Sequence, residues 1–219
     1  MLLELSRTPA HIMRQNKDWE RLKLQFPGLD HFFHKKEELL ARFRAPHQDY
    51  IKNYSAPLIS LSLNRAAFFY FFCSVTTPNA ILDLGSGFST YVFKQYLRNT
   101  GGRITSVDDS TYWLEETERF LKSHQLDGNG LLNWSAFEKL PPQTFDLIFL
   151  DIGDFEFRLQ ILPRLLQLVI DGTLLLIDDF HVPVYRKAIV EQCRQQDLAC
   201  FSLRKVTRTR LSHNALVMA

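Results

Sequence analysis

The residues best suited to binding or chemistry begin at a glycine-rich corner in residues 80–94, "AILDLGSGFSTYVFK". An apolar stretch runs through this corner into a helical pattern, and glycine allows the close backbone approach that a ligand resting on such a turn needs. Asp83 lies inside the apolar stretch, where a carboxylate is costly unless it has partners, so we expect it to accept hydrogen bonds from the loop or from a ligand ammonium group. The candidate residues at the corner are Asp83, Gly85, Ser86, Gly87, Ser89 and Thr90.

Two common nucleotide-binding loops are excluded at this corner. The third glycine of a G-x-G-x-x-G dinucleotide fingerprint would stand at position 90, where this chain has Thr90, and that difference argues against a nicotinamide or flavin cofactor. The sequence also contains no G-x-x-x-x-G-K-[ST] motif, which excludes the phosphate-loop nucleotide hydrolases.

Acidic residues stand at the ends of the later apolar stretches. They are Asp108 after "ITSV", Asp151 after "FDLIFL", and Asp178 and Asp179 after "LLLI", with His181 close behind. In an open α/β sheet, ligands collect beyond the carboxyl ends of the strands, so we expect these groups to converge on the crevice that the glycine corner opens. One of Asp178 and Asp179 could instead cap the helix that starts near Pro183.

Asp108 is the candidate for binding a ribose. It lies 23 residues after Gly85, and an acidic residue at the end of the second strand can accept hydrogen bonds from both ribose hydroxyls. The alternative is that this position caps the following helix, a role that Asp109 or Ser110 could fill equally well. We therefore predict that Asp108 binds the ribose and that Asp109 or Ser110 is the cap.

Short apolar stretches alternate with helical patterns from residue 80 onward. Stretches that are apolar on both faces and separated by helices are typical of a parallel sheet covered on both sides. The last two stretches, 199–206 and 215–218, are joined by a segment too short for a helical crossover, so we expect them to pair antiparallel. The preceding strands are expected at residues 80–84, 103–107, 131–134, 145–150 and 173–177, with helices at 89–98, 161–169 and 184–196.

The N-terminal part of the chain has a different pattern. Residues 1–50 carry apolar side chains at helical spacing, punctuated by Pro27-Gly28 and Pro46, so two or three amphipathic helices are expected there. A nearly all-apolar helix should follow at residues 64–75.

The composition is that of an ordinary globular protein. Of 219 residues, 46% are hydrophobic and 23% charged, so one large domain with a sizeable core is expected. A net charge of +2 gives no indication of a nucleic-acid or membrane partner, and the most apolar window, residues 66–75, is about half as long as a membrane span. The three cysteines lack metal-type spacing and are expected to be buried free thiols, and residues 1–5 do not resemble a secretory signal, so we expect a cytoplasmic protein.

Four motifs taken together resemble the class I S-adenosylmethionine-dependent methyltransferases. They are "DLGSGFST" at residues 83–90, "SVD" at 106–108, "FDLIFLD" at 145–151 and "GTLLLIDD" at 172–179. The glycine loop in the first motif, G-S-G-x-S, is most similar to that of the small O-methyltransferase-like branch. The resemblance implies an α/β fold with a Rossmann-like, seven-stranded, mostly parallel sheet that ends in an antiparallel hairpin. Residues 56–219 would form this domain, and residues 1–55 an N-terminal helical cap over the substrate.

The resemblance also implies a role for each candidate in binding S-adenosylmethionine (SAM). The corner Gly85-Ser86-Gly87 would lie under the methionine part of the cofactor, with Asp83 or Thr90 at its amino-acid end. Asp108 would hold the ribose, and Ser135 or Ala136 would lie near the adenine. Asp151 would lie beside the cofactor and the transferred methyl group.

His181 is the first candidate for a general base, because the pKa of an unperturbed histidine is nearest neutrality. The alternative is an ordinary surface histidine after a strand. The other candidates are Asp151, Asp154 and Asp179. Since the SAM sulfonium is already an activated electrophile, the protein has only to place a nucleophile in line with the methyl group and remove a proton where needed.

One branch of the family, the catechol-type enzymes, binds a divalent cation through an acid after the fourth strand and an Asp-Asn pair after the fifth. This chain offers three oxygen donors of the kind that Mg²⁺ prefers, Asp151, Asp178 and Asp179. It departs from the branch because Asp179 stands where Asn is expected and Asp154 stands where the branch carries a lysine base. We therefore assign no metal ligands, with Mg²⁺ as an alternative.

The leading hypothesis is a SAM-dependent methyltransferase that acts on an oxygen, or less favourably a nitrogen, of a small molecule. A second hypothesis is a catalytically inactive SAM-binding protein with a regulatory or interaction role. A methyltransferase of RNA or protein is a third, which the near-neutral charge disfavours. The sequence leaves a homodimer open and does not identify the substrate.

Overall fold

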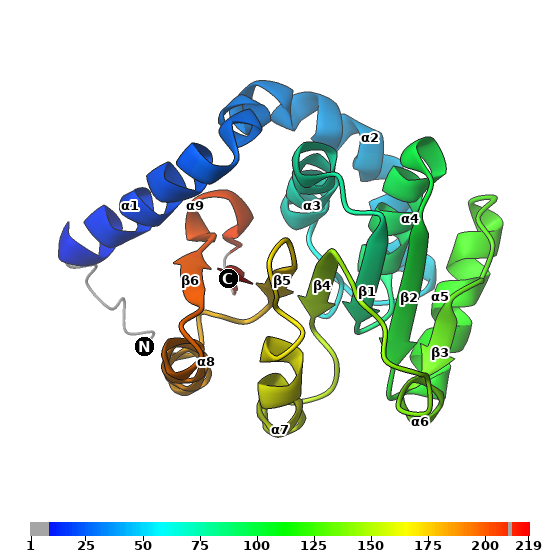
Figure 1. Cartoon of the computed structure of the whole chain (residues 1–219). Coiled ribbons are helices and arrows are strands. Elements are labelled where there is room, and N and C mark those ends of the chain that lie inside the picture. Colours follow the sequence, from blue (N-terminus) through cyan, green and yellow to red (C-terminus); the bar gives the residue numbers. More distant parts are fainter. Residues whose placement is uncertain (1–8, 210–211) are drawn as a thin grey trace, which may run out of the picture.

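The computed structural model describes residues 9–209 and 212–219 (Figure 1). Residues 1–8, on which the expectation about a secretory signal depends, lie outside the described residues. Within the described part, no helix is both long and apolar enough to cross a membrane.

The described part contains a single seven-stranded sheet in the order β3-β2-β1-β4-β5-β7-β6. All neighbouring pairs from β3 to β5 are parallel, whereas β7 runs antiparallel to both β5 and β6. The predicted parallel sheet with a terminal antiparallel pair is therefore confirmed. The strands are β1 (Ala80–Leu84), β2 (Arg103–Asp108), β3 (Leu131–Asn133), β4 (Leu147–Leu150), β5 (Leu174–Ile177), β6 (Ala199–Ser202) and β7 (Ala215–Met218).

Helices cover both faces of the sheet (Figure 1). On one face lie α1 (Pro9–Gln25), a 3-10 turn at Pro27–His31, α2 (Phe32–Asn53), α3 (Leu63–Thr76), α4 (Phe88–Thr100) and α5 (Thr111–Ser123). On the other lie α6 (Trp134–Phe137), α7 (Phe155–Leu166) and α8 (Pro183–Gln195), and the short α9 (Arg204–Thr207) precedes β7.

The two cores explain why β4 and β5 are apolar at every position. In β4, Leu147 and Phe149 pack against the α1–α5 side, while Ile148 and Leu150 pack against the α6–α8 side. Successive side chains of a strand point to opposite faces, so a strand that is covered on both sides favours apolar residues at every position.

The N-terminal helices form as predicted, with one difference. Pro27 and Gly28 interrupt the helical structure between α1 and α2, as expected, but Pro46 lies inside α2. Proline removes one helical hydrogen bond, at a cost of about 3 kcal/mol. The buried side chains of Phe43 and Tyr50 on either side of Pro46 anchor the helix to the core and offset that cost.

Two strands were predicted to continue into residues that are helical, β4 begins at Leu147 rather than at residue 145, and α7 spans Phe155–Leu166 rather than residues 161–169. The stretch 199–206 is a strand only as far as Ser202, after which residues 204–207 form α9. Asn64 of α3 donates to the carbonyl oxygen of Val206 at 2.8 Å, so this turn is fixed by a tertiary contact that periodicity does not reveal. Trp134, predicted in the third strand, begins α6 because Asn133 caps that helix.

The three cysteines are thiols that take part in no disulfide bond, as predicted. Cys73 and Cys193 are buried, whereas Cys200 is only partly buried.

Candidate active site

A cavity of about 640 Å³ opens at the carboxyl ends of the parallel strands. The loops after β1, β2, β4 and β5 and the connection between α2 and α3 supply most of its wall, and side chains of α2, α3, α5 and α7 complete it together with Thr209 and Ser212 before β7. The predicted convergence of the strand-end residues is therefore observed. Among the lining residues are Gly85, Ser86, Asp108, Asp109, Asp151, Asp178, Asp179 and His181.

The glycine corner is shaped by its neighbours on both sides. Gly85 has φ +109°, and a Cβ at this position would lie 2.7 Å from the carbonyl oxygen of Asp151. Its amide donates to the carbonyl oxygen of Val107 at 2.8 Å. Gly87 is the N-cap residue of α4, and a Cβ there would lie 2.8 Å from the hydroxyl of Tyr50. Any side chain at position 85 would therefore collide with backbone and require a strained conformation.

Asp83 lies behind this corner and is fully buried. Its Oδ2 accepts hydrogen bonds from Thr90 at 2.7 Å and from Ser89 and Ser106 at 3.2 Å each, while its Oδ1 has no partner among the described residues. Burial raises the pKa of Asp83 to about 7. Neither Asp83 nor Thr90 lines the cavity, so the structure places both where they hold the loop from behind.

Asp108 faces the cavity from the end of β2 and is almost fully buried. Its Oδ2 accepts hydrogen bonds from the amide and hydroxyl of Ser86, at 2.8 and 2.9 Å, and its Oδ1 accepts one from the amide of Ser110 at 2.9 Å. Burial raises the pKa of Asp108. The hydroxyl of Ser110 accepts from the amide of Trp113 and so caps α5, as one of the two predicted caps.

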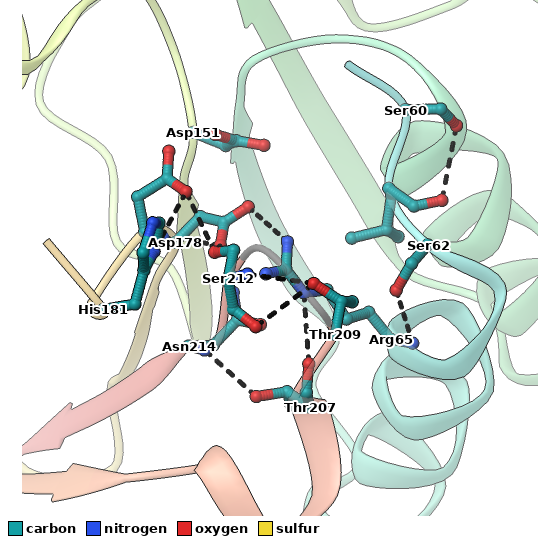
Figure 2. Close-up of polar contacts among 12 residues, drawn as sticks. Ser60, Ser62, Arg65, Asp151, Asp178, His181, Thr207, Thr209, Ser212 and Asn214 are labelled. Carbon is teal, nitrogen blue, oxygen red and sulfur yellow. Dashed lines mark hydrogen bonds and ion pairs between the residues drawn. The ribbon is translucent and has the colours of Figure 1, made fainter. Parts of the chain in front are cut away.

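The carboxylates after β4 and β5 form a cluster. Single oxygens of Asp151, Asp178 and Asp179 all lie within 4.8 Å of one another. Burial, together with the neighbouring Asp178 carboxylate, raises the pKa of Asp151. Figure 2 shows Asp151 and Asp178 turned toward the same space from their two strands.

Two buried arginines hold this cluster together. Arg158 of α7 contacts Asp151 at 2.8 Å and Asp179 at 3.2 Å. Arg65 of α3 contacts Asp178 at 2.7 Å (Figure 2). Their side chains are only 8% and 7% exposed. Sequence reasoning missed both arginines, although Arg65 interrupts an otherwise apolar helical stretch, which was a usable signal.

His181 lies at the cavity wall next to Asp179. Its Nδ1 is 3.6 Å from Oδ1 of Asp179, within reach of an ion pair. Asp179 itself has φ +53°, a left-handed conformation uncommon for residues other than glycine. This turn allows its carboxylate to reach both Arg158 and the hydroxyl of Ser212, the latter at 2.9 Å.

A second histidine behind His181 stays neutral. The rings of His181 and His213 have centroids 6.4 Å apart. Burial, with added repulsion from Arg204, lowers the pKa of His213 to about 3. Near neutral pH, His213 therefore adds no positive charge to the site.

The remaining candidates lie away from the cavity wall. The side chain of Asp154 accepts from the amide of Phe157 at 2.8 Å and caps α7. Ser135 and Ala136 lie in α6 and do not line the cavity, and the hydroxyl of Ser135 donates to Asn133. The structure thus brings the strand-end acids and His181 together, but not these three residues.

A family comparison decides what this arrangement is. Residues 82–180 match the model of a family described as a methyltransferase domain. This stretch contains the glycine corner, Asp108, and the cluster after β4 and β5. This stretch, a little under half of the chain, is thus similar to a methyltransferase domain. Together with the observed sheet order, the match supports the predicted resemblance to the class I methyltransferases.

Several solved methyltransferases share the fold. The methyltransferase PaMTH1 of Podospora anserina, solved with SAH, has a TM-score of 0.63 at 15% identity over 80% of this chain and 86% of its own. An O-methyltransferase from Bacillus cereus, also solved with SAH, has a TM-score of 0.54 at 15% identity, over 84% of this chain and 89% of its own. TomG of Streptomyces achromogenes is an O-methyltransferase involved in tomaymycin synthesis and was solved with SAM. It has a TM-score of 0.53 at 14% identity, over 82% of this chain and 88% of its own. No curated protein matches the sequence significantly.

Proposed function

We propose that this methyltransferase domain binds SAM in the cavity and transfers its methyl group to an oxygen atom of a small molecule. The observation that carries the proposal is that a single cavity joins the glycine corner to the cluster after β4 and β5. Its volume of about 640 Å³ lies in the range of small-molecule sites, roughly 300–1,000 Å³.

The charge of the cavity suits a cationic cofactor. Five carboxylates line it, those of Asp108, Asp109, Asp151, Asp178 and Asp179, against two guanidinium groups, those of Arg65 and Arg158. The carboxylates therefore exceed the arginines by three when all are ionised. SAM carries a positively charged sulfur, which this excess of negative charge favours.

The residues that would hold the cofactor follow from the geometry. Gly85 and Ser86 offer backbone at the cavity wall for the methionine part, and Gly87, with Asp83 and Thr90 behind the loop, keeps that backbone in place. Asp108 would bind the ribose from the end of β2. Ser135 and Ala136 are proposed near the adenine, beyond the residues that line the cavity.

Bound SAM would supply the methyl group as an electrophile. The electron pair of the broken carbon–sulfur bond would stay on the sulfur, which becomes the neutral thioether of SAH. The protein has to remove a proton from the attacking hydroxyl and keep that oxygen in line. His181 is the proposed base. Its Nδ1 faces Asp179, whose carboxylate would stabilise the protonated ring and leave Nε2 to accept the substrate proton. Asp151, with its raised pKa, is the second carboxylate at the reacting centre.

The substrate is proposed to enter under the N-terminal cap, residues 1–55, and the connection that follows it. Pro57, Leu58 and Ile59 line the cavity together with Trp113, and Leu58 and Ile59 are highly exposed. These side chains favour a small molecule with an apolar body. The oxygen acceptor is favoured because two structural neighbours, from Bacillus cereus and Streptomyces achromogenes, are O-methyltransferases.

The test is transfer of a labelled methyl group from SAM to a panel of phenols, catechols, carboxylic acids and amines. We expect turnover of a hydroxyl-bearing compound by the wild-type chain. We expect His181→Gln to lower kcat by about 10²–10⁴-fold, the usual contribution of a general base, while SAH still binds in calorimetry. His34→Gln, on the exposed face of α2, is the matched control.

Two outcomes would refute parts of the proposal. Binding of SAM and SAH with no turnover of any compound class would favour the inactive SAM-binding protein. Full activity of His181→Gln would remove His181 as the base and leave Asp151 or Asp179 in that role.

A further inference from the structure

The cluster after β4 and β5 stands where the catechol-type branch is expected to bind a divalent cation. Asp151 follows β4, and Asp178 and Asp179 follow β5, with one oxygen of each within 4.8 Å of the others. By position and spacing alone, these carboxylates could serve as metal ligands. The question is whether their oxygens and their charge leave room for a cation.

Five of the six oxygens of the cluster have a partner among the described residues. Both oxygens of Asp178 are engaged, Oδ2 by Arg65 and Oδ1 by the amide of Asp179 and the hydroxyl of Ser212 (Figure 2). Asp179 accepts from Ser212 through Oδ1 and from Arg158 through Oδ2. Asp151 contacts Arg158 through Oδ1. A cation would have to replace several of these contacts at once.

Arg158 cannot move aside easily. Its Nε donates to the carbonyl oxygen of Ile152 at 2.8 Å, and its Nη2 donates to the carbonyl oxygens of Asp151 at 3.0 Å and Gly153 at 3.2 Å. The guanidinium thus ties the turn after β4 to the carboxylates. A buried arginine with this many acceptors would lose all of them if it swung out to solvent.

Charge also opposes a metal ion. A cation bound to Oδ1 of Asp151 would lie at most about 5.4 Å from Nη2 of Arg158, given that contact of 2.8 Å and an oxygen–metal distance of about 2.0–2.6 Å. The two guanidinium groups already compensate two of the three negative charges. Two positive charges added beside two buried arginines would be strongly repelled.

We infer that Arg158 and Arg65 take the place of the divalent cation, so that this cluster binds no metal ion. Arg158 is a positioning residue: it fixes Asp151 and Asp179 around the reacting centre, as a shared metal ion would. The acceptor oxygen is then activated by proton removal alone. The inference concerns metal binding, which is measured without methyl transfer and so is tested independently of the proposed function.

The experiment is titration of the full-length chain with Mn²⁺, followed by electron paramagnetic resonance of the free ion and by calorimetry, and repeated with Mg²⁺. The wild-type chain is expected to bind neither ion at millimolar concentration, and its methyl transfer, once a substrate is found, should not change with a chelator. Arg158→Gln is expected to gain Mn²⁺ binding, and a second change, Asp151→Asn, should remove that gain. Arg164→Gln, on the exposed face of the same helix, is the matched control and should gain nothing.

Wild-type binding of Mn²⁺ that Asp178→Asn abolishes would overturn the inference. This titration decides the matter even if Arg158→Gln fails to fold. A folded Arg158→Gln variant that binds no more Mn²⁺ than the wild type would also overturn it, because the guanidinium would then not be what excludes the ion.

Discussion

Replacing Asp83 with asparagine should make the stability of the domain much less dependent on pH. The Asp83 side chain is fully buried, and burial raises its pKa to about 7. In the unfolded chain, an aspartate has a pKa of about 3.9. Between these two values the folded protein keeps a proton that the unfolded chain has released, so stability falls as pH rises through this window.

The size of the effect follows from the two pKa values. Each unit of difference corresponds to about 1.4 kcal/mol, so ionisation of Asp83 costs the folded state about 4 kcal/mol once the pH exceeds both values. Between pH 5 and pH 8, the wild type should lose about 2.5 kcal/mol of unfolding free energy through this group alone. Asp83→Asn removes the group, and with it this loss.

The measurement is urea denaturation of the cofactor-free wild type and of Asp83→Asn at pH 5 and at pH 8. The stability of the variant relative to the wild type should rise by about 2.5 kcal/mol from the lower to the higher pH. Asp171→Asn, in an exposed turn, controls for the general effect of removing one negative charge. An equal stability difference at both pH values would show that Asp83 ionises normally in the folded protein, and the reasoning from burial would be wrong.

Two further predictions concern the cofactor site. Asp108→Ala should weaken SAH binding by about tenfold or more, because a charge-assisted contact to the ribose is lost; unchanged affinity in calorimetry, with a native circular dichroism spectrum, would identify a different ribose ligand. Gly85→Ala should prevent SAH binding and lower the melting temperature markedly, because its Cβ would lie 2.7 Å from the carbonyl oxygen of Asp151, whereas Gly101→Ala, whose Cβ meets no atom within 4 Å, should show only the smaller cost of its positive-φ backbone. Equal melting temperatures for the two glycine variants would contradict the close approach at the corner.

Features that depend on local pattern could be predicted from the sequence. The strands are covered on both faces, so continuous apolar runs such as residues 147–150 mark them directly. The glycine corner and the acids at the strand ends were also found, because the carboxyl ends of parallel strands necessarily meet at one edge.

Features that depend on contacts between distant segments could not be predicted. Arg65 and Asp178 are 113 residues apart and meet only in the folded chain. Pro46 was read as a break, but burial of α2 on both sides of it keeps the helix continuous. The distinction between residues that line the cavity and residues behind its wall, such as Asp83 and Thr90, likewise requires the three-dimensional arrangement.

The aromatic packing of the N-terminal helices limits how this enzyme could change its substrate. Trp19 of α1 and Phe32, at the start of α2, pack against Phe68 of α3, and Phe69 of the same helix contacts Phe149 of β4, with ring centroids 4.9 Å apart. The helices α1 to α3 are thus continuous with the interior that supports the sheet. Exchanging the first 55 residues for those of another methyltransferase would expose or overfill that interior. New specificity is therefore more accessible through the short connection that carries Leu58 and Ile59 than through replacement of the helices.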